Sequence, residues 1–335
     1  MKHFIIIFLM GIISFSQSFA SEVETIKRNF EQSFETTLSE SDVKVIAVCN
    51  AKDLVIEDVV SYLKSQNYNL SKETLQAIAI KIVHFKRIKE EVNKSPKIVK
   101  AFVEGQIYST ILPKQIPFLL RDKVLIDEII RVYQNEKTLL FNISTLKNEK
   151  QNIKEIYQQT AKKLKAIESY YESIALFNKE HLPSLKQATE KLNTALALYP
   201  NFVEAYSRRG LSYFYLEDYK QAILNYSEAI KIDPIYAEAL WHRGISYQKT
   251  EQYEQSIKDL NEAIRLNLKN AECYKDRGIT YYNLKQYDAA IADFTKALEL
   301  DNNLTEVYYH RGMAYNGLQK LDLAAEDFNK VMKKQ

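Results

Sequence analysis

The stretch that decides the fold is Val203–Tyr236, with the sequence VEAYSRRGLSYFYLEDYKQAILNYSEAIKIDPIY. The same pattern begins again at regular intervals, at Ala237, Ala271 and Thr305, so the chain carries it four times. Glycine and tyrosine recur at fixed positions of the pattern, at Gly210, Gly244, Gly278 and Gly312 and at Tyr213, Tyr247, Tyr281 and Tyr315. Four copies with this many matched positions indicate a repeat architecture.

Each copy contains two segments with the periodicity of amphipathic helices. In the first copy they are Ala205–Leu216 and Tyr219–Ile232, where apolar residues recur three or four apart. Each copy is therefore predicted to be a helical hairpin. Glycine inside a helix costs about 1 kcal/mol relative to alanine, so its return in every first helix indicates that two helices pack closely there. Because one hairpin cannot bury its apolar face alone, the copies are expected to stack into a solenoid.

These positions resemble the tetratricopeptide repeat, a helical hairpin in which aromatic residues, Leu-Gly, Tyr, Ala and Pro recur at fixed places. The resemblance covers residues 203–335, as repeats 203–236, 237–270, 271–304 and 305–335. The chain departs from the family pattern by having arginine where leucine is commonest, at Arg209, Arg243, Arg277 and Arg311. We expect ion pairs within each hairpin with the acidic residues of the second helices, Asp259, Asp293 and Asp327, and Asn225 is the exception.

Two further segments precede the clear repeats. Residues 169–202 resemble a degenerate repeat that would cap the solenoid. Residues 137–180 carry an apolar heptad seam from Leu139 to Ile174, which predicts a long helix connecting the amino-terminal segment to the repeats. Such a seam can form a coiled coil or pack on the amino-terminal helices, and the sequence alone leaves both open.

Residues 21–136 show no repeat and no family resemblance, and we expect them to form a small helical domain of unknown role. Capping residues and prolines predict helices from Ser71 to about Asn93, over Lys97–Leu112, and from Pro117 to Tyr133. The apolar run Val43–Val48 has no partner strand in view, so we expect buried helix or irregular core. The expected class is all-α: a tetratricopeptide α-solenoid preceded by a long heptad helix and this small domain.

Residues 1–20 have the three parts of a secretory signal peptide. Lys2 gives a basic start, Phe4–Phe15 is an apolar core, and Ser18–Ala20 supplies small residues at the cleavage positions. The apolar core is shorter than the stretch needed to cross a bilayer, which is roughly 20 residues, so an uncleaved anchor is the weaker alternative. We therefore expect cleavage after Ala20 and export, to the periplasm or the medium if the source is bacterial.

Neither composition nor motifs indicate an enzyme. The formal net charge is +3, and neither half of the chain is basic enough to indicate nucleic-acid binding. The sequence has no zinc-ligand spacing, phosphate loop or nucleophile motif, and His242 and His310 lie two repeats apart. We expect no catalytic residue, no metal and no cofactor, while an enzyme within residues 21–136 stays an alternative.

The resemblance implies a protein-interaction scaffold whose concave surface, lined by the first helices, binds a segment of a partner protein. A glutamate recurs at the edge of all four repeats, and aromatic residues lie along the middle. The expected partner-binding residues are Glu204, Phe214, Tyr215, Glu238, Trp241, Lys249, Glu272, Lys275, Tyr282, Glu306 and Tyr309. Such a surface favours a partner segment with apolar and basic residues.

Two other interpretations stay open. The glutamates can simply begin helices, where a carboxylate favours the positive end of the dipole, and the aromatic residues can pack between repeats. The heptad seam and the last repeat can also mediate self-assembly, which would make the chain a structural homo-oligomer. We expect no nucleic-acid partner and no membrane span once the signal is removed.

Overall fold

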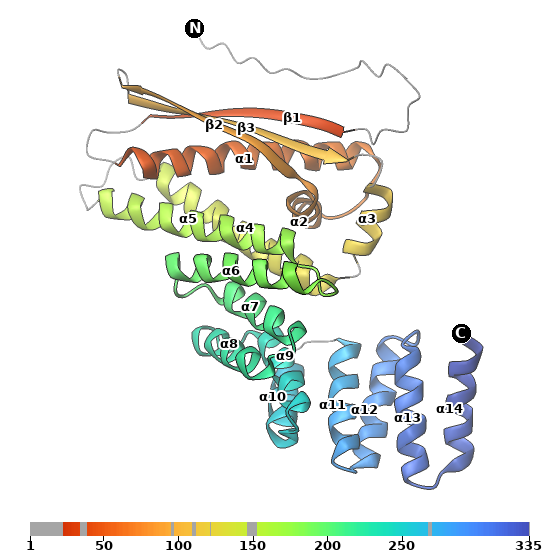
Figure 1. Ribbon diagram of the computed structural model, residues 1–335. Helices are drawn as coiled ribbons and strands as arrows, with labels where there is room; N and C mark the ends of the chain where they lie inside the picture. Colours follow the sequence, from red (N-terminus) through yellow and green to blue (C-terminus); the bar gives the residue numbers. More distant parts are fainter. Residues whose placement is uncertain are drawn as a thin grey trace.

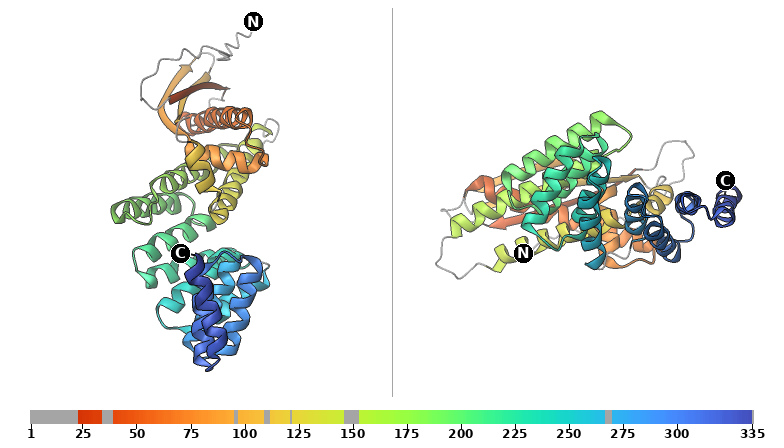
Figure 2. Two further views of the ribbon diagram at one scale, coloured as in Figure 1. Left: turned by 90° about the vertical axis from the view of Figure 1, so that its right-hand side faces the viewer. Right: turned by 90° about the horizontal axis from the view of Figure 1, so that it is seen from below.

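The computed structural model describes residues 23–33, 39–94, 97–108, 112–120, 122–145, 153–266 and 270–334. The predicted signal peptide, residues 1–20, lies outside these ranges. The chain begins in a part that combines a sheet with helices and continues into a succession of helical hairpins (Figure 1). Seen from two further directions, the molecule is elongated, with the sheet at one end and the last hairpins at the other (Figure 2).

The amino-terminal part is built on an antiparallel sheet with the strand order β1-β3-β2. The strands are β1 (Val23–Ser33), β2 (His84–Lys94) and β3 (Lys97–Tyr108). Helix α1 (Glu40–Ser65) packs along β1 and β3. Gly105 of β3 allows this close approach, because a Cβ at that position would lie 2.7 Å from Cγ1 of Val55 in α1. The sheet therefore covers one side of α1 and leaves the other side for helices (Figure 1).

This sheet corrects two of the predicted helices. The helix that begins after Ser71, α2 (Lys72–Ile82), ends before Asn93, and His84–Lys94 form β2. The predicted helix Lys97–Leu112 is wrong, because residues 97–108 form β3. In β3 alternate residues are buried, at Val99, Ala101, Val103 and Ile107, which is the period of a strand that packs one face on α1. The apolar run Val43–Val48 lies within α1, which confirms the prediction of buried helix.

The heptad seam is divided between two helices, α4 (Lys123–Thr145) and α5 (Ile153–Leu176). Ile143 of α4 and Leu164 of α5 belong to one buried cluster, together with Ile46 of α1. In one continuous helix Ile143 and Leu164 would lie about 31 Å apart, so the seam folds back on itself. Of the two alternatives for the seam, packing on the amino-terminal helices is the one that the structure shows, since α5 lies against both α1 and α4.

The remaining helices form the predicted hairpins, and the all-α class is confirmed for most of the described residues, with the amino-terminal sheet as the exception. After α3 (Leu112–Leu119) and the two seam helices, the chain continues with α6 (Leu182–Leu198), α7 (Val203–Tyr215), α8 (Tyr219–Ile232), α9 (Ala237–Lys249), α10 (Tyr253–Arg265), α11 (Ala271–Asn283), α12 (Tyr287–Leu300), α13 (Thr305–Gly317) and α14 (Leu321–Lys334). Consecutive helices from α5 to α14 pack against each other. Each hairpin therefore leans on the next, as in a solenoid.

Contacts inside the hairpins explain the recurring residues. A Cβ at Gly278 would lie 2.7 Å from the buried ring of Phe294, so only glycine lets α11 and α12 approach this closely. The predicted ion pairs are present: Nε of each arginine lies 2.6–2.7 Å from an aspartate oxygen, in the pairs Arg243–Asp259, Arg277–Asp293 and Arg311–Asp327. Asn225 is the exception, as expected, and its side-chain oxygen accepts a hydrogen bond of 2.6 Å from Arg209.

Candidate functional site

The first helices of the repeats, α7, α9, α11 and α13, carry the residues predicted to bind a partner. Helix α4 of the amino-terminal part lies against the first two of them. Val124 of α4 packs against the buried cluster that contains Leu240 and Trp241 of α9. Part of the predicted surface is therefore covered by the chain itself.

The recurring glutamates form an acidic row along the first helices: Glu204, Glu238, Glu272 and Glu306. Arg131 of α4 contacts the first two of them. Its Nε lies 3.8 Å from Oε1 of Glu204, and its Nη1 lies 3.6 Å from Oε1 of Glu238. Its Nη2 donates a hydrogen bond of 2.9 Å to the hydroxyl of Tyr236, and its guanidinium carbon lies 4.6 Å from the centre of that ring. Burial raises the pKa of Glu204 even though Arg131 opposes this shift. One guanidinium therefore serves both glutamates, whose side chains are only 19 % and 15 % exposed.

A second ion pair joins α4 to the solenoid. Arg208 of α7 pairs with Glu128 of α4, and both side chains are only 5 % exposed. The guanidinium carbon of Arg208 also lies 5.6 Å from the ring centre of Phe177, which follows α5. Burial lowers the pKa of Arg208. The amino-terminal part and the first repeat therefore share a buried, charged junction.

The third and fourth glutamates of the row face a lysine of the same surface. Lys275 of α11 pairs with Glu272, and its Nζ lies 3.4 Å from Oε2 of Glu306 and 3.9 Å from Oδ1 of Asp276. One ammonium group thus meets three carboxylates. Glu306 remains 61 % exposed, and Nε2 of His310 lies 3.4 Å from its other carboxylate oxygen. This half of the acidic row is open to solvent and has more carboxylates than lysines.

The aromatic residues of the predicted binding surface also include packed and exposed members. In the first repeat, Phe214 packs on Tyr219, and Tyr215 packs edge-on against Phe177, with ring centres 5.4 and 5.9 Å apart. These rings contact other parts of the chain, and Lys249 at the end of α9 is exposed. The contact between Tyr215 and Phe177 matches the interpretation that aromatic residues pack between repeats, whereas the contact between Phe214 and Tyr219 lies within one hairpin.

Trp241 is a buried residue and Tyr309 an exposed one. The Trp241 side chain is 8 % exposed, its indole donates a hydrogen bond of 2.8 Å to Oδ2 of Asp276, and it stacks on His242 with ring centres 4.6 Å apart. Tyr282 is half-buried and packs against Tyr287. Tyr309 is 48 % exposed. The role of these residues in binding stays a prediction, and Tyr309 is the most accessible of the three aromatic side chains.

Sequence reasoning missed a column of ionisable residues inside the solenoid. It lies just before the arginine column and consists of Arg208, His242, Asp276 and His310. Burial raises the pKa of Asp276 to about 7, and burial followed by the charge of Arg208 lowers the pKa of His242 to about 4. The repeat spacing carried this signal, because every repeat has an ionisable residue at the same position.

We expect Asp276→Asn to change the pH dependence of stability. The folded protein favours the protonated carboxyl, because the pKa of Asp276 is raised from 3.8 to about 7. The unfolded chain therefore binds fewer protons than the folded chain in this window, and stability falls as pH rises from about 4 to about 7. Urea titrations at a series of pH values should show that wild type loses stability relative to Asp276→Asn across that window. A constant difference between the two proteins would contradict the expectation.

Within the part of the chain that the structure describes, no three or more histidine, cysteine or acidic side chains gather as metal ligands do. Among the helices in the same ranges, none combines the length and the apolar character required to span a membrane.

Comparison with known proteins gives matches for the repeats. A TPR repeat model matches residues 210–251, a tetratricopeptide repeat model matches 271–304, and a second tetratricopeptide repeat model matches 237–270 and 305–333. No curated protein matches the sequence.

Several solved structures are similar in part. A crystal structure of MamA is 26 % identical, covers 47 % of this chain and 91 % of its own, and has a TM-score of 0.44. MamA from Desulfovibrio magneticus RS-1 is 24 % identical, with coverages of 51 % and 94 % and a TM-score of 0.46. YrrB, described as a TPR protein with an unusual peptide-binding site, is 24 % identical, with coverages of 51 % and 86 % and a TM-score of 0.44. The matched family models and the observed hairpins together identify residues 210–333 as a tetratricopeptide-repeat segment.

Proposed function

We propose that the protein is an exported, non-enzymatic scaffold, and that the concave surface of its last two clear repeats binds a segment of a partner protein. Tetratricopeptide repeats are a protein-interaction architecture, which supports the scaffold role. The signal-like residues 1–20 support export, to the periplasm or the medium if the source is bacterial. The partner segment would carry apolar and basic residues.

The observation that carries this proposal is the difference between the two halves of the acidic row. Glu204 and Glu238 are paired with Arg131, whereas Glu272 and Glu306 share Lys275 with Asp276. A basic residue of a partner could reach the carboxylate of Glu306, because this side chain is 61 % exposed. An apolar residue of the same segment would find the exposed ring of Tyr309 on the same helix. Charge of this kind steers and orients a partner, and a partly exposed tyrosine supplies contact area.

A panel of labelled peptides of equal length tests the proposal. The peptides have leucines interspersed with lysine, with glutamate or with serine, and fluorescence anisotropy measures their binding to the full chain. We expect the lysine peptide to bind most tightly and to weaken with salt. Glu306→Gln and Tyr309→Ala should each weaken its binding by about 1–2 kcal/mol.

Leu224→Ala is the matched control for these variants. Leu224 lies on α8, a second helix, and is one of the exposed large apolar residues. Its replacement should leave peptide binding unchanged. Equal binding of the lysine peptide by wild type, Glu306→Gln and Tyr309→Ala would contradict the proposed surface.

Self-assembly is the second candidate function, and α14 favours it. Leu321, Leu323 and Met332 of this helix are all exposed. Such a face can pack against another copy of the chain. Light scattering of the full chain over a range of concentrations separates the two functions. A monomer at every concentration removes self-assembly, and a dimer that survives dilution supports it.

A further inference from the structure

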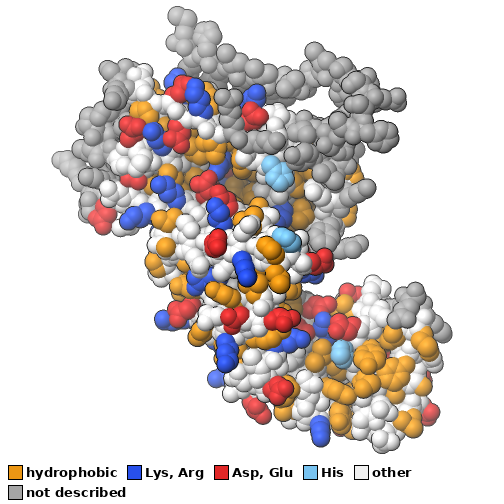
Figure 3. All heavy atoms as spheres, viewed as in Figure 1, with side chains coloured by type: hydrophobic (Ala, Val, Ile, Leu, Met, Phe, Trp, Pro, Cys, Tyr) orange, Lys and Arg blue, Asp and Glu red, His pale blue; other side chains and the backbone are white. Residues whose placement is uncertain are grey.

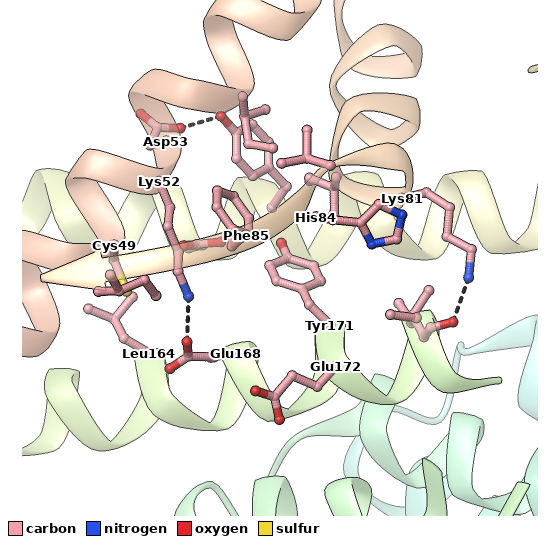
Figure 4. A pocket seen from close by; sticks show the side chains of 18 residues that line it. Cys49, Lys52, Asp53, Lys81, His84, Phe85, Leu164, Glu168, Tyr171 and Glu172 are labelled. Carbon is pink, nitrogen blue, oxygen red and sulfur yellow. Dashed lines mark hydrogen bonds and ion pairs between the residues drawn. The ribbon is translucent and has the colours of Figure 1, made fainter. Parts of the chain in front are cut away.

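A cavity of about 340 Å³ lies in the amino-terminal part, away from the residues predicted to bind a partner. Helices α1, α2, α4 and α5 and strand β2 line it (Figure 4). The space-filling view shows this face hollowed, with apolar side chains inside and charged side chains around them (Figure 3). Much of the lining is aliphatic, including Ile56, Ile80, Val83, Leu164 and Ile174. Its volume is more than twice the ~150 Å³ of an apolar cavity that binds benzene.

Most charged groups of the cavity already have partners. Lys52 of α1 pairs with Glu168 of α5, and Asp53 accepts hydrogen bonds from Tyr133 and Lys137. Lys81 of α2 donates to the carbonyl oxygen of Ile174, in the last turn of α5. The carbonyls of a last turn lack their usual partners one turn further on, so this lysine caps the helix end.

Two polar groups in the lining, Tyr171 and Glu136, have no ion-pair partner among the described residues. The hydroxyl oxygen of Tyr171 is buried and, within the described residues, has no hydrogen-bond partner. Tyr171 rises from α5 into the cavity, between Phe85 and His84 (Figure 4). Glu136 of α4 lines the same cavity and lies beside this hydroxyl, so that Tyr171 lowers the pKa of Glu136 and Glu136 raises the pKa of Tyr171. Among the ion pairs of the described residues, none includes Glu136.

The surroundings of Glu136 favour a positively charged ligand. Burial and the nearby charge of Asp53 raise the pKa of Glu136 to about 7, although Tyr171, Lys52 and Lys137 act in the opposite direction. The aromatic rings of the cavity already attract ammonium groups: Nζ of Lys52 lies 5.2 Å from the centre of Phe85, and Nζ of Lys137 lies 5.8 Å from that of Tyr133. Carboxylates combined with aromatic rings are the groups that bind organic cations.

We propose that this cavity binds a small organic amine, whose ammonium group pairs with Glu136 and the Tyr171 hydroxyl and whose apolar body packs on the aliphatic lining. The ammonium group has three N–H donors, which can be shared between the carboxylate of Glu136 and the hydroxyl oxygen of Tyr171. The volume admits a ligand with one ring and a short side chain. The site belongs to the amino-terminal part and does not depend on the partner surface of the repeats.

Three probes of similar shape test the charge preference: 2-phenylethylamine, 2-phenylethanol and 3-phenylpropionate. Calorimetry or ligand-observed NMR on the full chain measures their binding at neutral pH, where the amine is protonated. We expect the amine to bind about tenfold more tightly than the alcohol, because its hydrogen bond to a carboxylate is charge-assisted. The carboxylate probe should bind most weakly. Equal binding of the three probes, or binding of none, overturns the proposal.

Variants test the residues. Glu136→Gln keeps the shape of the side chain and should reduce amine affinity to that of the alcohol, while alcohol binding stays unchanged. Tyr171→Phe should weaken the amine by a smaller factor. Glu190→Gln, an exposed position on α6, is the control and should leave all three affinities unchanged. Thermal transitions confirm that each variant is folded. A folded Glu136→Gln protein that still prefers the amine overturns the proposal.

Discussion

Glu128→Ala is expected to lower the free energy of unfolding by about 3–5 kcal/mol, because it leaves a buried guanidinium without its counter-charge. Glu128 and Arg208 are each only 5 % exposed, and they join α4 to the first clear repeat. Arg208 cannot lose its proton at any ordinary pH. Its uncompensated charge therefore either stays buried or reaches water by separating α4 from α7. Urea unfolding followed by fluorescence measures the loss, because Trp241 is the single tryptophan and lies beside α4.

Two comparisons separate this effect from ordinary truncation. Glu228→Ala removes the acidic partner of an exposed pair with Lys231 and should cost at most about 0.5 kcal/mol. Replacing both members of the buried pair, Glu128→Leu with Arg208→Met, should recover most of the lost stability, since no isolated charge remains. Similar losses for Glu128→Ala and for Glu228→Ala would show that the junction contributes little.

Trp241→Ala is expected to lower the free energy of unfolding by about 3–5 kcal/mol, as large core truncations do. The indole is almost fully buried, stacks on His242 and donates its N–H to Asp276. The substitution leaves a cavity and removes a donor from a buried carboxyl, and the two effects add to each other. Urea unfolding followed by circular dichroism measures the loss, since this variant has no tryptophan.

Tyr309→Ala is the matched comparison for Trp241. The sequence predicts that both residues bind a partner. In the structure Trp241 is buried, whereas the Tyr309 side chain is about half exposed. Its loss should therefore change stability by less than about 1 kcal/mol. If Trp241→Ala and Tyr309→Ala unfolded at the same urea concentration, Trp241 would be a surface residue. The concave surface would then extend into the second repeat.

The sequence predicts the hairpins well because their contacts are local. Arg243 and Asp259 lie 16 residues apart on the two helices of one hairpin, and the repeat shows the same pairing in the next two copies. The glycine column predicts the close approach of the helices for the same reason. A repeated local contact leaves a periodic pattern in sequence.

The sequence could not predict contacts that join distant segments. Arg131 is far from Glu204 and Glu238 in the chain, and nothing in its neighbourhood indicates that it enters the acidic row. The sequence does not indicate the sheet, because Ser95 and Pro96, which lie between β2 and β3, have the pattern of a helix start. Buried residues alternate along β3, but this pattern indicates a strand only if partner strands are known. A strand is stable only when paired, and β3 pairs with β1 and β2.

Arg131 and Glu128 of α4 form ion pairs with α7 and α9, so the solenoid is attached to the amino-terminal part at its first two clear repeats. Its last repeats pack on their neighbours in succession, so small rotations at each hairpin add up toward α14. The open carboxylates and Tyr309 lie on this outer span. If the proposed partner binds to this outer span, it contacts the repeats farthest from the amino-terminal part, which contains the cavity.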